Sequence, residues 1–272
     1  MYTENRTFDW APRFDEKSRK YAIRPLLGTS RPERKATFWQ EGTVLDQGSE
    51  GACVGFGWMA DILAKPVTPE QQPSEELGNA LAQFYYEEAQ KLDRWEGEDY
   101  EGTSVLAGAK VMQRHGLISA YRWCFSVEDI IDTVCNKGPV VLGVPWYSSM
   151  YRTLSDGLVY VDMSKEPVGG HCITITGYDP AMQVGRQTLE VFRWRNSWGQ
   201  DYGVNGSGYI KVSDLKRLFD SPHRGAEACV PIVRNKPVLE YPPVTVIKKR
   251  TFLDYLLNAV IHWFKFRFSK NF

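Results

Sequence analysis

The chain has 272 residues, of which 43% are hydrophobic and 24% charged, and 33 basic residues balance 33 acidic ones. A chain of this length can bury a sizeable core in one large domain or in two lobes that share a cleft. The ordinary composition excludes a disordered or membrane-embedded protein, and zero net charge gives no reason to expect nucleic acid as a partner.

The first twenty residues, MYTENRTFDWAPRFDEKSRK, are charged throughout and lack the apolar run of a signal peptide. We expect residues 1–20 to form an N-terminal arm or a short pro-segment. The prolines and glycines scattered over residues 20–45 then predict an extended, loop-rich stretch.

Three helices are predicted in the first half of the chain. Apolar residues at helical spacing predict the first one from Cys53 to a stop before Pro66. The second is predicted over about 74–92 with a serine N-cap, and the third over about 104–115, ending at Gly116.

The character of the sequence changes to strand after Gly138-Pro139, where short β-branched or aromatic runs alternate with Gly, Asp and Asn. These runs are PVVLGVPWY, GLVYVDM, HCITITGYD, TLEVFRWRN and GYIKV. Helices first and antiparallel strands second predict an α+β protein with two lobes. The predicted domain covers 21–230, with a mainly helical lobe at about 44–125 and a β-rich lobe at about 126–230.

Residues 231–272 begin with a proline-rich stretch that is typical of a linker and end in a basic, aromatic tail. Its apolar stretch is shorter than the roughly 20 residues that span a bilayer. The tail is consistent with docking to a protein partner, packing on the domain itself or contact with an anionic membrane surface.

The five cysteines are odd in number and contain no CxxC pair, which argues against a disulfide framework and against structural zinc. Four histidines without an HExxH motif leave little room for a metal site. We therefore expect a cytoplasmic protein without metal or cofactor.

One set of residues predicts a catalytic site with a cysteine nucleophile. Cys53 opens a predicted helix, whose N-terminus favours a thiolate, and His171 in GGHC stands at the start of a strand-like run. If they face each other, they form a thiolate–imidazolium pair, which Asn196 orients through its side-chain oxygen. The Cys53 backbone N–H and the Gln47 amide supply donors for an oxyanion.

The blocks QGSEGAC, GGHC and NSWGQDYGVNGSGYIKV resemble, in order, the three signature blocks of the papain-like cysteine peptidases (C1), over roughly residues 21–230. The resemblance implies a papain-like two-lobe fold that binds a peptide or protein substrate between its lobes. It also implies Cys53 as nucleophile, His171 as acid–base, Asn196 as its orienting partner and Gln47 as oxyanion donor. Four further residues are expected at the substrate: Gly102, Thr103, Cys172 and Trp198.

Two departures from the family pattern stand out. The family has a cysteine three positions before the nucleophile and an aromatic residue after it, whereas this chain has Glu50 and Val54. One family disulfide is thus absent, as in bacterial or bacteriophage members, and a phage-encoded protein could be particle-associated. Only about twenty residues precede the region of resemblance, so any self-inhibition must be short or external.

The sequence favours a cysteine endopeptidase that works through an acyl-enzyme intermediate. The first alternative is a catalytically idle papain-like fold that serves as a binding or particle-structural protein. The second keeps the nucleophile but changes the acceptor, as in acyl transfer or cleavage of cell-wall amides.

Overall fold

A computed structural model describes residues 6–12, 15–28, 33–93, 102–221, 225–235 and 239–240. Residues 1–241 form one compact unit, which is the subject below. The C-terminal tail predicted to dock a partner, a membrane or the domain itself lies outside the described residues.

Three helices follow one another in the first half of the unit, as the sequence predicts: α1 (Cys53–Leu63), α2 (Glu75–Leu92) and α3 (Val105–Arg114). Serine side chains cap two of them, because Ser74 accepts from the Leu77 N–H and Ser104 from the Ala107 N–H. Helix α1 has no side-chain cap and is buried along almost its whole length. Its N-terminal peptide groups therefore lie inside the protein, next to Cys53.

The second half contributes most of an antiparallel sheet with the strand order β2-β7-β3-β4-β5-β6, and β1 pairs with β4. The bounds are β1 Thr37–Phe38, β2 Ile118–Cys124, β3 Val140–Trp146, β4 Gly169–Val184, β5 Gln187–Arg195, β6 Ser207–Lys211 and β7 Glu227–Arg234. Strand β3 is buried at every residue, consistent with its uninterrupted apolar run. It sits between β4 and β7, at the centre of the sheet.

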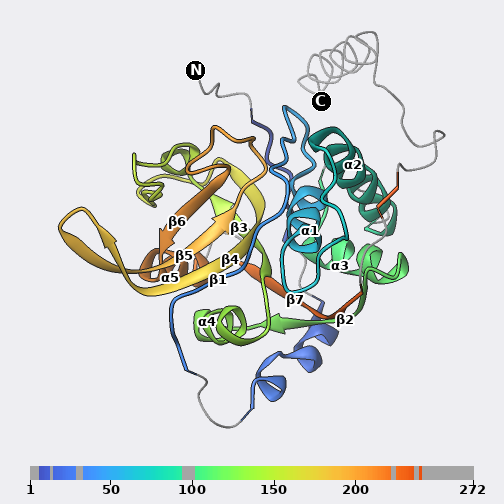
Figure 1. Cartoon of the computed structure of the whole chain (residues 1–272), viewed down its shortest axis with the longest axis horizontal. Helices are drawn as coiled ribbons and strands as arrows, with labels where there is room; N and C mark the ends of the chain where they lie inside the picture. The colour runs from blue at the N-terminus through green and yellow to red at the C-terminus, as the bar shows by residue number, and fades with distance from the viewer. Residues whose placement is uncertain are drawn as a thin grey trace, which may run out of the picture. The chain divides into compact units, whose positions relative to one another are not determined.

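Figure 1 shows α1, α2 and α3 gathered on one side of the unit and strands β3 to β6 on the other, which is the expected α+β arrangement. Two separate groups of buried side chains match this division. One surrounds α1, α2 and α3, and the other surrounds β3, β4 and β5.

The exact division of the chain differs from the sequence prediction. The half predicted as β-rich also contains helices α4 (Val127–Asn136) and α5 (Val212–Phe219). Strand β2 lies within 44–125, predicted as helical, and pairs with β7. The run GLVYVDM forms no strand and makes only isolated bridges, one of them to Tyr209 of β6. Strand β7 extends to Arg234, so residues 231–234 belong to the sheet rather than to a linker.

A buried ion pair joins the helices to the sheet. Arg234 at the end of β7 donates to Asp61 of α1 at 2.9 Å, and to the carbonyl oxygen of Pro139 at 3.0 Å. Both charged side chains are almost fully buried. The pair fixes α1, and with it Cys53, against the sheet that carries His171.

None of the helices in the described part of the chain has the length and apolar character needed to cross a membrane.

Candidate active site

Cys53 is the first residue of α1, and its thiol is fully buried. Helix α1 packs on β4, where the Thr174 hydroxyl donates to the Gly57 carbonyl oxygen at 2.5 Å. A side chain at Gly57 would collide with the Cys172 sulfur, so this glycine permits the close approach of helix and strand. The glycines of α1, which weaken the helix, are therefore explained by packing.

His171 lies near the start of β4, and Asn196 directly follows β5. The two strands are neighbours, and the His171 Nε2 atom is 2.8 Å from the Asn196 side-chain oxygen. Asn196 has no N–H on that oxygen, so Nε2 carries the proton and Nδ1 is the basic nitrogen. Nδ1 is buried and has no hydrogen-bond partner among the described residues.

Aromatic side chains enclose this histidine. Trp198 stacks on the imidazole with ring centroids 5.0 Å apart, and Trp146 meets it edge-on at 4.7 Å. Phe8, from the N-terminal segment, also meets it edge-on. The rings exclude water from the bond between His171 and Asn196.

Gln47 lies in the loop before α1, and its amide is held in one orientation. Its side-chain oxygen accepts from the Ser197 hydroxyl at 2.5 Å. Its Nε2 atom therefore points the other way, where it donates to the Glu50 carbonyl oxygen at 2.7 Å and to the Thr7 carbonyl oxygen at 3.4 Å. A peptide carbonyl from another part of the chain thus contacts the amide that the sequence predicts as an oxyanion donor.

Cys53 and His171 come from the two sides of the cleft. Burial raises the pKa of Cys53, and backbone hydrogen bonds with Asp9 and with Cys172, the residue after His171, oppose this rise. Within the described part of the chain, no hydrogen bond joins the Cys53 sulfur to the imidazole. The structure brings the four predicted catalytic residues into one region, with the sulfur beside the backbone of the histidine's neighbour.

The N-terminal segment, residues 6–11, occupies the cleft as an extended peptide. The Trp10 N–H donates to the Gly170 carbonyl oxygen at 2.9 Å on the sheet side. On the helical side, Thr103 donates to the Asp9 carbonyl oxygen at 3.0 Å and accepts from the Ala11 N–H at 3.1 Å. The segment is therefore hydrogen-bonded through its backbone to both walls beside Cys53 and His171.

Gly102 and Thr103, predicted to meet a substrate backbone, here meet this segment. Gly102 has a φ of +107°, and a side chain there would collide with the Asp9 carbonyl oxygen. Only glycine suits both the conformation and the space. Cys172 is predicted at the substrate as well, but its side chain is fully buried and faces α1. The Cys172 sulfur thus packs between helix and sheet, and the contact of this residue with a substrate stays a prediction.

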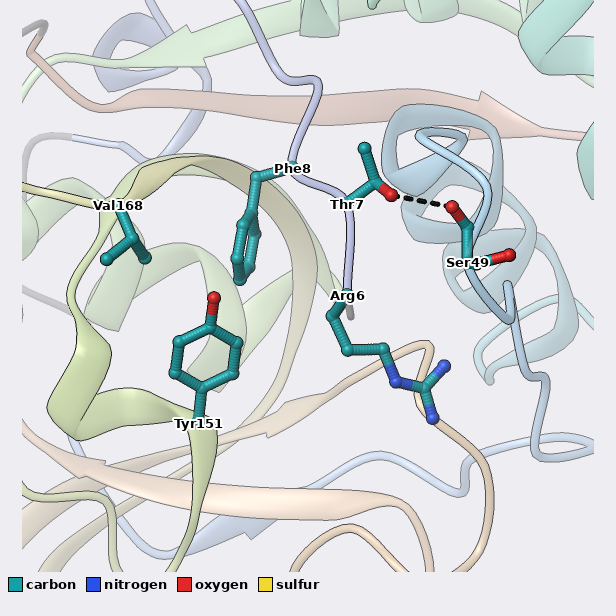
Figure 2. Close-up of a pocket in the computed structure, with 6 residues that line it drawn as sticks. All are labelled: Arg6, Thr7, Phe8, Ser49, Tyr151 and Val168. Atoms are coloured by element: carbon teal, nitrogen blue, oxygen red, sulfur yellow. Dashed lines mark hydrogen bonds between the residues drawn. The ribbon is translucent and has the colours of Figure 1, made fainter. Parts of the chain in front are cut away.

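An ion pair and several hydrogen bonds hold the start of the segment. Arg6 donates to Asp46 at 2.6 Å and to the Gly48 carbonyl oxygen at 2.9 Å. Figure 2 shows Thr7 donating to the Ser49 carbonyl oxygen on one side, while Phe8 lies beside Tyr151 and Val168 on the other. An open pocket of about 560 Å³ remains between these residues.

The covered cleft changes the protonation of both reactive groups. Burial raises the pKa of Cys53 to about 11 and lowers the pKa of His171 to about 4. A charge from Arg6 lowers the His171 pKa further, while Asn196 raises it. With the segment in place, neutral thiol and neutral imidazole are favoured at pH 7, and the predicted ion pair is not.

Sequence reasoning missed four residues of this site: Phe8, Trp10, Ser197 and Glu227. Ser197 lies inside the quoted NSWG block, so its position could have identified it. Trp10 and Glu227 are separated by 217 residues, and their hydrogen bond follows from no pattern in the sequence.

Comparison with known proteins supports the family resemblance seen in the sequence. The sequence model of the family described as "Papain family cysteine protease" matches residues 78–223, more than half of the chain. This range includes His171 and Asn196 and begins after Cys53. A cysteine protease from Blomia tropicalis is 27% identical over 90 residues, which cover 33% of this chain and 26% of that protein. The match thus spans about a quarter of the relative's length.

Solved structures share the fold at low sequence identity. Xylellain, a cysteine protease from Xylella fastidiosa, has a TM-score of 0.60 and 17% identity, covering 85% of this chain and 97% of that chain. A digestive procathepsin L 3 from the larval midgut of Tenebrio molitor has a TM-score of 0.52 and 14% identity, covering 84% and 76%. The chain belongs to the papain family of cysteine proteases and has the papain-like two-lobe fold.

Proposed function

We propose that this chain is a cysteine endopeptidase with Cys53 as nucleophile. The observation that carries the proposal is the extended segment 6–11, which is hydrogen-bonded through its backbone to both walls of the cleft beside Cys53 and His171. A cleft that holds one extended peptide in this way can hold another. The segment crosses the whole cleft, from Asp46 to Thr103, and this supports cleavage inside a chain rather than at its end.

The reaction begins when His171 takes the thiol proton of Cys53 on Nδ1, giving a thiolate–imidazolium pair. The thiolate attacks the peptide carbonyl carbon, and the C–N bond breaks as the imidazolium protonates the departing amine. The product is an acyl-enzyme, a thioester on Cys53. Water then gives its proton to His171 and attacks the thioester, which releases the carboxylic acid and restores Cys53.

Asn196 and Gln47 assist without bonding covalently to the substrate. Asn196 accepts the Nε2 proton of His171, so the ring keeps Nδ1 available for the thiol. Gln47, fixed by Ser197, donates its Nε2–H to the oxyanion that forms during attack. The Thr7 carbonyl oxygen now near Gln47 supports this role, because it shows that a peptide carbonyl fits there.

The same segment makes the enzyme latent, because a substrate has to displace it. The sequence leaves open a short or an external self-inhibition, and residues 6–11 support the short one. Displacement uncovers the two reactive groups and removes the burial that keeps both neutral. We propose that the ion pair forms in that open state.

Hydrolysis of a diverse peptide library, followed by mass spectrometry, tests the activity. We expect internal cleavage by the full chain, and its loss, by a factor of at least about a thousand, in Cys53→Ala. A matched control is Cys135→Ala, because Cys135 is partly exposed, lies on α4 and contacts the Lys35 carbonyl oxygen rather than the N-terminal segment. Equal cleavage by wild type and Cys53→Ala would exclude the proposed nucleophile. No cleavage by any form, including one with the segment loosened, would favour the catalytically idle alternative.

A further inference from the structure

Glu41 lies in the loop after β1, and its carboxylate is bound to two arginines of the sheet. Its Oε2 atom is 2.7 Å from Nη2 of Arg195, the last residue of β5, and its Oε1 atom is 3.1 Å from Nε of Arg193. The two arginines are two residues apart on one strand, so they lie on the same face of the sheet. In the described part of the chain, Glu41 is the one carboxylate that forms an ion pair with either arginine.

Both oxygens of the Glu41 carboxylate also accept hydrogen bonds from hydroxyl groups. The Thr176 hydroxyl of β4 donates to Oε1 at 2.5 Å, and the Ser207 hydroxyl of β6 donates to Oε2 at 2.8 Å. The side chains of Glu41 and Arg195 are only 12% and 8% exposed. Because it is bound to three neighbouring strands with little access to water, this carboxylate is held in one position.

The loop that carries Glu41 is itself fixed to the helical side of the unit. The Gln40 carbonyl oxygen accepts from the Lys65 N–H at 2.9 Å, two residues after the end of α1. The Thr43 N–H donates to the Gln72 side-chain oxygen at 3.1 Å. Glu41 therefore connects the segment between α1 and α2 to strands β4, β5 and β6.

Arg195 connects Glu41 to Asn196. Its Nη1 atom donates to the Asn205 carbonyl oxygen, and its guanidinium lies so close to Gly206 that a side chain there would collide with it. The Gly206 carbonyl oxygen accepts from the Asn196 N–H at 3.0 Å. The guanidinium therefore holds the turn that fixes the Asn196 backbone, and Arg195 is also the residue directly before Asn196.

Loss of the Glu41 charge would leave two guanidinium groups side by side. Burial lowers the pKa of Arg195, the Glu41 carboxylate opposes this effect, and the charge of Arg193 adds to it. A buried guanidinium without its counter-ion is strongly unfavourable, so Arg195 would move towards water. That movement would release the Asn205 carbonyl oxygen and displace the backbone of Asn196.

We propose that Glu41 is a positioning residue of the active site, which holds Asn196 in place through Arg195 and so keeps the His171 imidazole oriented. A small displacement of an orienting group is enough to slow a reaction strongly, even when the changed residue lies away from the substrate. This inference rests on the proposed function of Cys53 and His171, and it names a residue on which their geometry depends.

The first test measures kcat and KM for peptide hydrolysis by the full chain. Glu41→Gln and Arg195→Gln should each lower kcat about ten- to a hundredfold and change KM by no more than about twofold, because Asn196 moves and the peptide-binding walls do not. Glu190→Gln is the matched control, since this carboxylate is also on β5 but accepts from the Tyr178 hydroxyl, and it should leave kcat unchanged. An unchanged kcat in Glu41→Gln would overturn the proposal.

A double variant separates positioning from a general loss of structure. Asn196→Ala removes the group that Glu41 positions, so adding Glu41→Gln should lower kcat by no more than about a further twofold. Arg193→Gln removes the other arginine partner of Glu41, so it should reduce stability towards urea but lower kcat less than Arg195→Gln does. Additive losses of kcat in the double variant, or equal losses in the two arginine variants, would contradict the role of Glu41.

Proton NMR of the full chain tests the same role without any activity. The His171 Nε2 proton is buried and bonded to Asn196, so it should exchange slowly with water and give a resonance that Asn196→Ala abolishes. Glu41→Gln and Arg195→Gln should accelerate this exchange at least about tenfold, and Glu190→Gln should not.

The two readouts also separate this role from the proposed peptidase activity. Faster exchange of the His171 Nε2 proton in Glu41→Gln supports the positioning role even where no form hydrolyses peptides. A resonance that Glu41→Gln leaves unchanged, or that the wild type itself lacks, refutes the positioning role, and hydrolysis by the wild type would then still support the peptidase.

Discussion

The hydrogen bond from His171 Nε2 to Asn196 decides which imidazole nitrogen can serve Cys53. It leaves Nδ1 as the basic atom, and the aromatic rings of Trp146 and Trp198 hold the imidazole in that plane. Residues of this kind can be identified from sequence because Cys, His and Asn stand in characteristic blocks. Trp10 and Glu227 could not, because their roles depend on two chain segments that meet only in the folded structure.

Burial favours the neutral forms of Cys53 and His171, so the covered form is most stable in a defined pH range. The Cys53 pKa is raised to about 11 from 9.0, so its contribution is complete below about 9 and is lost as the pH rises towards 11. The His171 pKa is lowered to about 4 from 6.5, so its contribution is complete above about 6.5 and is lost as the pH falls towards 4. The segment should be held most firmly between these limits.

The rate of Cys53 alkylation by iodoacetamide, followed by peptide mapping over pH 6 to 10, checks this. We expect slow alkylation of the wild type that is still rising at pH 10. In Trp10→Ala, where the thiol is less buried, the rate should be higher and should level off at a lower pH. Identical profiles for both proteins would show that the segment does not control the thiol.

At the scale of elements, the sequence predicts the capped helices and most of the strands, but it does not predict the boundaries of the two lobes. Serine caps and apolar spacing predict α2 and α3 to within a residue or two. The sequence does not predict strand β2 or the last residues of β7. Each forms only by pairing with the other, about 110 residues away in the chain. Pairing between distant segments is decided by tertiary structure and leaves no local pattern.

The buried pair of Asp61 and Arg234 should be the main electrostatic link between α1 and β7. Burial raises the pKa of Asp61, and Arg234 opposes the rise, so losing the arginine leaves a buried carboxyl without this partner. Arg234→Met should lower the free energy of unfolding by about 3–5 kcal/mol in urea denaturation. Asp61→Asn combined with Arg234→Met should recover part of the loss.

A surface pair provides the control for that measurement. Lys91 and Glu88 form a more exposed pair one turn apart on α2, so Lys91→Met should change stability by no more than about 0.5 kcal/mol. Equal effects of Arg234→Met and Lys91→Met would contradict the assigned role of the buried pair.

At the scale of the whole molecule, the sequence predicts the α+β class and the papain-like fold, and the structure and the family match agree. What the sequence does not show is the state of the cleft. The segment 6–11 contacts Asp46, Gln47 and Thr103, as well as the backbone at Gly170, and covers the nucleophile. The structure is therefore that of a covered form, which a substrate has to open under the proposed function.

The most direct test is labelling of the full chain with a thiol-reactive peptide electrophile, located by mass spectrometry. We predict one label, on Cys53, formed slowly in the wild type, at least about tenfold faster in Trp10→Ala and not at all in Cys53→Ala. Labelling that persists in Cys53→Ala, or that spares Cys53 in both wild type and Trp10→Ala, would contradict it.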